Sequence, residues 1–160
     1  MGETSTDLTR WLAPQGARAQ LTCGSWQAAV TAAIKPLVAI GAVDEPYLAA
    51  VLERERTFPT GLPTEPYGVA LPHASGPLRR AALSLISLRE PVVFGQMGAP
   101  DEQVAVRLVI GLAVEPRQQV ATLDRLIRLI QQPGFLQAVV AAPDDAALYR
   151  RWQQWTSAST

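Results

Sequence analysis

His73 is the only histidine of this 160-residue chain and the residue best suited to nucleophilic chemistry. It ends the segment Gly-Val-Ala-Leu-Pro-His (68–73), an apolar run interrupted by a proline and followed by a loop at 74–77. Imidazole has an ordinary pKa of about 6.5, so much of it is neutral near pH 7. A neutral ring nitrogen at the end of a strand can attack, hold and release a group without a stronger base. We therefore expect any covalent chemistry to occur at His73.

The composition indicates one soluble domain and excludes several classes of protein. A chain of 160 residues, 48% of them hydrophobic, can form a core and is not typical of disorder. The 14 basic and 14 acidic residues cancel, so the basic surface of a nucleic-acid binder is not expected. The polar start lacks a signal-peptide core, and no apolar run is long enough to cross a bilayer. We expect a cytoplasmic protein with no nucleic-acid partner and no membrane insertion.

Metal and disulfide chemistry are not expected either. Cys23 is the only cysteine, so the chain has neither a disulfide framework nor a cysteine-rich metal site. One histidine and one cysteine are too few for the ligand set of a typical transition-metal site. We expect no metal and no other cofactor.

The N-terminal part is predicted to be a loose lead-in followed by a helix. Residues 1–20 are predicted to be loosely ordered. Ser25 is a suitable N-cap for a helix that runs to about Ile40 and stops at Gly41. Pro36 within it predicts a kink or a division into two shorter pieces.

A second helix and the strand that carries His73 are predicted to follow. Asp44 is expected to cap the helix, which ends in the charged cluster Glu-Arg-Glu-Arg at 53–56. A loop rich in proline and glycine, 58–63, then leads to a strand that ends at His73. Because Pro72 keeps the preceding residue extended, it helps fix how the strand presents the histidine.

Two further strands are predicted in the middle of the chain. The run 81–88 has apolar residues on both of its faces, so both faces can be buried, and 104–114 is rich in β-branched residues. A loop is expected at 96–102.

The C-terminal part is predicted to be helical. Residues 117–132 form the clearest amphipathic helix of the sequence, and 135–141 and 143–155 are expected to be helices as well. Their apolar stripes are Val120, Leu123, Ile127 and Ile130 in the first, and Leu148, Trp152 and Trp155 in the last. The order of elements indicates an α/β fold with a sheet covered by helices on both faces.

The residues around His73 resemble a known family. The stretch R-E-R-T-F-P-T-G (54–61), followed by G-V-A-L-P-H (68–73), resembles the signature of enzyme IIA components of the bacterial phosphoenolpyruvate-dependent sugar phosphotransferase system, more narrowly the fructose/mannitol class. The segment R-E-P-V-V-F-G-Q-M-G (89–98) is similar to the galactitol-type branch. The run 108–113 and the amphipathic helix after it also fit. The resemblance covers about residues 20–150.

The resemblance implies a fold, a reaction and partners. The fold is a single α/β domain at 21–156 with a mixed central sheet flanked by helices, of the phosphotransferase/anion transport protein type, followed by a tail at 157–160. His73 accepts a phosphoryl group from the phosphocarrier protein HPr and passes it to a cysteine of enzyme IIB, for uptake of galactitol or a related polyol or sugar. Arg54 is implied to stabilise the phosphate. Many members carry a second histidine at the position of Gln119, which this chain lacks.

Phosphoryl transfer sets further expectations for the site. The His73 Nδ1–H is expected to bond to a backbone carbonyl or to the Gln119 amide oxygen, which leaves Nε2 for phosphate. A carrier has to release its phosphate, so one cation, Arg54, suffices, with Arg56 or the backbone N–H groups around Gly76 as further candidates. Two partners have to reach the ring, so we expect an exposed histidine with apolar residues such as Leu71 and Leu78 around it.

Two alternatives remain open on the sequence alone. One is a regulatory domain of the same fold, whose phosphorylation state signals to a transcription factor or a kinase. The other is a catalytically silent binding module, in which His73 would be buried or blocked.

Overall fold

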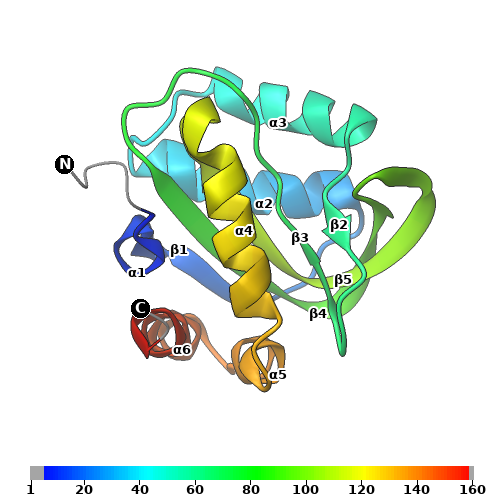
Figure 1. Ribbon diagram of the computed structural model, residues 1–160, viewed down its shortest axis with the longest axis vertical. Helices are drawn as coiled ribbons and strands as arrows, with labels where there is room; N and C mark the ends of the chain where they lie inside the picture. The colour runs from blue at the N-terminus through cyan, green and yellow to red at the C-terminus, as the bar shows by residue number, and fades with distance from the viewer. Residues whose placement is uncertain (1–5, 159–160) are drawn as a thin grey trace.

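The structure, a computed structural model, describes residues 6–158, which form helices on both sides of one sheet (Figure 1). The elements in chain order are α1 (Leu8–Trp11), β1 (Leu12–Leu21), α2 (Trp26–Ala39), α3 (Pro46–Thr57), β2 (Gly61–Leu62), β3 (Gly68–Ala70), β4 (Ala82–Gln96), β5 (Ala99–Ala113), the 3₁₀ turn η1 (Pro116–Gln118), α4 (Gln119–Ile130), α5 (Phe135–Val140) and α6 (Asp145–Ala158). Among these described helices, none is both long and apolar enough to cross a membrane.

The sheet is mixed and has five strands in the order β1-β4-β2-β3-β5, with β4 also paired to β5. The long strands β4 and β5 form an antiparallel hairpin, while β1 runs parallel to β4 and β3 runs parallel to β5. The short β2 pairs with both β3 and β4. This mixed sheet between helices confirms the predicted α/β fold.

Two hydrophobic cores lie on opposite faces of the sheet. One is formed with α1, α4, α5 and α6, and the other with α2 and α3. Strand β4 serves both cores, because Leu83 and Leu85 belong to the first and Ile86 and Leu88 to the second. The prediction that both faces of 81–88 are buried is confirmed.

Helix α2 begins and ends as the sequence predicts. The Ser25 side chain accepts a hydrogen bond from the Ala28 N–H at 3.2 Å. At the other end Gly41 has φ +77° and its N–H bonds to the Val38 carbonyl, which closes the last turn in a Schellman arrangement. Pro36 is buried inside one continuous helix, so the predicted division into two pieces is not found.

The expectation that residues 1–20 are loosely ordered is wrong for the described part of that range, residues 6–20. Residues from Leu8 onward form α1 and then β1, and only 1–5 lie outside the description. The indole N–H of Trp152 in α6 donates to the Leu8 carbonyl at 2.8 Å, which ties α1 to the last helix. The expected domain boundary at 20/21 therefore falls inside β1. Residues 157 and 158 of the expected tail continue α6, and 159–160 are not described.

Three local expectations are also corrected. The N-cap of α3 is Glu45 and not Asp44. The Asp44 carboxylate is paired with Arg79 instead. Only Met97 and Gly98 separate β4 from β5, so the connection is shorter than the loop expected at 96–102. In α4 the buried side is formed by Thr122, Leu126, Leu129 and Ile130.

Val120 is the exposed member of the predicted α4 stripe. Its side chain is 81% exposed. The buried set has the spacing i, i+4, i+7 and i+8, which fits a helical face as well as the predicted stripe does, so periodicity alone could not choose between them.

Gly68 lies where strands β3 and β5 approach closely. A Cβ at this position would be 2.5 Å from the Ala105 carbonyl oxygen and 2.6 Å from Val104 Cγ1. We expect Gly68→Ala to lower the free energy of unfolding by about 1–3 kcal/mol, as overpacking does. Gly24→Ala is the matched control, because nothing lies within 4 Å of its added Cβ. Urea unfolding of both variants measures this, and equal stabilities would contradict it.

Candidate active site

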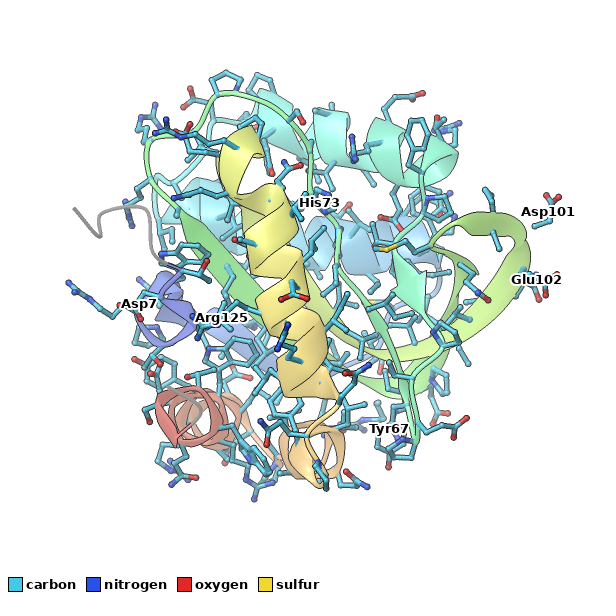
Figure 2. The ribbon with its side chains drawn as sticks, in the orientation of Figure 1. Asp7, Tyr67, His73, Asp101, Glu102 and Arg125 are labelled. Atoms are coloured by element: carbon cyan, nitrogen blue, oxygen red, sulfur yellow. The ribbon has the colours of Figure 1, made fainter. Side chains whose placement is uncertain are left out.

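His73 lies three residues after the end of β3, near the N-terminal end of α4 (Figure 2). Its side chain is only 5% exposed, so the expectation of an exposed imidazole is wrong. The ring nevertheless lines a pocket of about 410 Å³. The other lining residues are Arg54, Phe58, Pro59, Thr60, Met97, Gly98, Pro100 and Leu123. Since Phe58, Gly98 and Pro100 are exposed, the pocket opens at the surface.

A backbone carbonyl fixes the orientation of the imidazole. His73 Nδ1 lies 2.7 Å from the Leu71 carbonyl oxygen. A carbonyl oxygen only accepts, so Nδ1 carries the proton and Nε2 of the neutral ring keeps its lone pair. One of the two partners expected for Nδ1, a backbone carbonyl, is therefore the one observed.

The surroundings keep the imidazole neutral. Burial lowers the pKa of His73 below its ordinary value, and the positive charge of Arg54 lowers it further. The hydrogen bond to Leu71 acts in the opposite direction but does not reverse the shift. Near pH 7 the ring is therefore an uncharged nucleophile.

The backbone on either side of His73 is held by buried groups. The Leu112 N–H donates to the Pro72 carbonyl at 3.0 Å. The Tyr47 hydroxyl donates to the Leu112 carbonyl at 2.7 Å and accepts from the Ala74 N–H at 3.1 Å. Tyr47 thus links α3 to the loop and to β5.

Gln119 does not make the contact that the sequence suggested. Its amide nitrogen donates to the Ala74 carbonyl oxygen at 3.3 Å. Within the described residues, no hydrogen bond joins Gln119 to the imidazole of His73. Gln119 therefore braces the residue after His73 rather than the ring.

Arg54 brings an unpaired cationic donor to the pocket. Its Nε is buried without a hydrogen-bond partner, and within residues 6–158 no carboxylate pairs with it. The guanidinium carbon lies 5.7 Å from the centre of the Phe58 ring, a cation–π contact. A buried donor with no partner is costly, so the site is suited to an anion that would supply one.

The two other candidate phosphate contacts lie outside this pocket. Arg56 is exposed and its Nε lies 3.8 Å from a carboxylate oxygen of Glu53. Gly76 lines a separate, smaller pocket with Tyr47 and Pro77. Of the two proposed arginines, Arg54 alone lines the pocket with His73.

Sequence analysis missed the buried pair Glu55 and Thr60. The Glu55 carboxylate accepts from the Thr60 N–H at 2.8 Å and from its hydroxyl at 3.0 Å. Burial raises the pKa of Glu55, although the bonds from Thr60 and the charge of Arg54 act against this. A signal was present, because Glu55 follows the buried Val51 by four residues and so shares its helix face.

The described residues contain no group of three or more His, Cys, Asp and Glu side chains that could hold a metal ion. The site therefore offers a neutral imidazole nitrogen beside an unpaired guanidinium, which is suited to accepting an anionic group.

Comparisons with known proteins identify the family. Residues 12–154 match the family described as phosphoenolpyruvate-dependent sugar phosphotransferase system, EIIA 2. This match spans most of the chain, so the chain belongs to that family of enzyme IIA proteins.

Individual relatives agree with this assignment. The chain is 36% identical over 111 residues to the galactitol-specific EIIA component of Escherichia coli K12, which covers 68% of this chain and 73% of the relative. The fold of this chain is similar to that of mannitol enzyme IIA in a complex with phosphorylated enzyme IIB from Escherichia coli. The TM-score is 0.69 at 22% identity, and the match covers 84% of this chain and 92% of the other. The nitrogen regulatory protein IIA-Ntr of Neisseria meningitidis has a TM-score of 0.72 at 21% identity, with coverage of 92% and 99%.

The electrostatics of the site predict the titration of His73. We expect its pKa to lie below 6.5 in the native chain and to rise towards that value in Arg54→Met, because this change removes the charge and keeps most of the volume. The chain has one imidazole, so an NMR titration reads His73 directly. Arg56→Met is the control, and an unchanged pKa in Arg54→Met would contradict the assignment.

Proposed function

We propose that this chain is a phosphoryl carrier that accepts phosphate from HPr on His73 Nε2 and passes it to a cysteine of an enzyme IIB. The observation that carries the proposal is the free Nε2 of a neutral, oriented imidazole in an open pocket beside the unpaired Arg54. In the first step a bond forms between Nε2 and phosphorus while the bond from phosphorus to the donor breaks. In the second the Nε2–phosphorus bond breaks and a sulfur–phosphorus bond forms.

The surrounding groups suit a reversible transfer. Phosphoryl transfer depends mainly on positioning and on neutralising the oxygens. The Leu71 carbonyl keeps the ring aimed and interacts favourably with Nδ1–H when the phosphorylated ring gains positive character. Arg54 offers its guanidinium donors to the phosphoryl oxygens. Since Arg54 is the one cation among the described residues that line the pocket, the phosphate would be stabilised without being trapped.

Docking partners would reach the ring through the mouth of the pocket. Phe58, 62% exposed, lies at this mouth, and the exposed Val120 follows Gln119 at the start of α4. Leu71, which we expected at this surface, is fully buried. Exposed apolar residues beside a polar centre suit a modest, transient interface.

One relative supports a proposal for the sugar. Because the galactitol-specific component of Escherichia coli is 36% identical, we propose that the chain serves the uptake of galactitol or a related polyol. We also propose that it acts in the cytoplasm, as the composition predicts. In a regulatory protein the same chemistry would be coupled to a transcription factor or kinase, so a panel of enzyme IIB partners separates the two roles.

A labelling experiment tests the transfer. Incubation with phosphoenolpyruvate, enzyme I and HPr is expected to give an acid-labile, base-stable phosphate on the native chain and none on His73→Ala. Adding enzyme IIB should then remove the label, and a galactitol-type IIB should do so faster than a mannitol-type one. A native chain that stays unlabelled while HPr is phosphorylated would reject the carrier function.

Arg54 is expected to matter for rate more than for stability. We expect Arg54→Met to slow phosphoryl transfer from HPr about ten- to hundredfold, the loss of one charged donor to the moving group. Arg56→Met removes an exposed arginine of the same helix that does not line the pocket, and it should keep the native rate. Stopped-flow or quenched-flow transfer assays measure this, and equal rates for the two variants would remove Arg54 from the site.

A further inference from the structure

We infer that Glu55 and Thr60 form a positioning pair that determines which nitrogen of His73 carries the proton. The inference rests on the proposed function for its effect on transfer, but its effect on the ring is independent of any partner. Both side chains are buried, and neither contacts the imidazole through a hydrogen bond among the described residues. They act through the backbone of Leu71.

The sheet register brings Thr60 to Leu71. Strands β2 and β3 are antiparallel with Gly61 opposite Ala70, so the residue before β2 faces the residue after β3. The Leu71 N–H does not continue the ladder with a neighbouring strand but donates to Thr60 Oγ1 at 2.9 Å. Leu71 is fully buried, so water cannot replace this bond.

The Leu71 N–H sets the direction of these hydrogen bonds. A backbone N–H can only donate, so Thr60 Oγ1 accepts from Leu71 and directs its own single proton to the Glu55 carboxylate. The carboxylate is itself held by the Thr60 N–H. A buried carboxylate is costly unless it is paired or hydrogen-bonded, and among the described residues its hydrogen-bond partners are all on Thr60.

Leu71 passes this constraint to the ring. With its N–H fixed by Thr60, its carbonyl oxygen points at His73 Nδ1. Pro72 restricts the backbone of Leu71, and the Leu112 N–H holds the Pro72 carbonyl. Loss of the Thr60 hydroxyl would leave the Leu71 N–H unpaired, and the segment would relax to find another partner for it. The carbonyl would then lose its alignment, and the Nε2–H tautomer would gain population.

The test is the tautomer ratio of His73, read from the ring ¹⁵N chemical shifts of the whole chain. Since His73 is the only histidine, its two ring nitrogens are observed without overlap. We expect Thr60→Val to raise the ratio of Nε2–H to Nδ1–H about fivefold or more, the effect of one buried hydrogen bond. Thr60→Ser keeps the hydroxyl and should keep the native ratio. Thr156→Val is the matched control, because it removes a buried threonine hydroxyl in α6, outside the pocket.

The outcomes are distinct. A native ratio in Thr60→Val, or an equal change in Thr156→Val, would overturn the inference. If Thr60→Val does not fold, Glu55→Met/Thr60→Val decides in its place, since it removes the carboxylate that would lose its hydroxyl partner. In the transfer assay we expect Thr60→Val to be slower by about tenfold or more and Thr60→Ser to recover most of the rate. If the native chain accepts no phosphate but the tautomer shifts as expected, the proposed function fails and the positioning role stands.

Discussion

The hydrogen bond from His73 Nδ1 to the Leu71 carbonyl oxygen is the contact on which the site depends. It joins residues two apart across a proline, so a small change in the backbone at 71–72 would break it. The bond determines which ring nitrogen has a free lone pair and where that lone pair points. A surface imidazole would exchange its proton between both nitrogens and sample many orientations. Burial of the ring removes that freedom but also shields the ring from solvent. The pocket leaves the ring accessible from one side.

The loop that carries this bond is held by both layers of the fold. Tyr47 reaches it from α3, which packs on one face of the sheet, and Gln119 reaches it from α4, which packs on the other. The Leu112 N–H anchors it from β5 between them. The two helix layers and β5 thus converge on residues 72–74. This convergence explains how a short segment after a three-residue strand can hold an oriented side chain.

The sequence predicted the parts of this structure that local pattern determines. Ser25 and Gly41 bound their helix as expected, and the motif that ends at His73 pointed to the pocket that His73 and Arg54 line together. Strand β1 was missed because its evidence is not local: its partner β4 lies some 70 residues away, and Pro14 and Gly16 interrupt its pattern. Residue type could not reveal that His73 is buried.

The pair Glu55 and Thr60 could not be predicted for a related reason. A charged residue four positions after a buried valine indicates a possible buried carboxylate, but not its partner. That partner is fixed by the register of β2 against β3, which depends on the tertiary fold. A motif can therefore suggest a role for a single side chain such as His73. It cannot suggest a contact that depends on the register of two strands, such as that of Glu55 with Thr60.

Arg54 acts on the proposed reaction in two ways that favour the same outcome. Its charge disfavours the imidazolium form, so it keeps Nε2 available to attack. The same charge favours an incoming anionic phosphoryl group, for which its Nε has an unfilled donor. A carboxylate in place of Arg54 would oppose both effects, because it would favour protonation of the ring and repel the phosphate. Glu55 avoids this conflict since its oxygens are directed to Thr60 and not to the imidazole. In the proposed reaction, the one cation among the described residues of the pocket would favour binding of an anion beside the neutral ring and still allow its release.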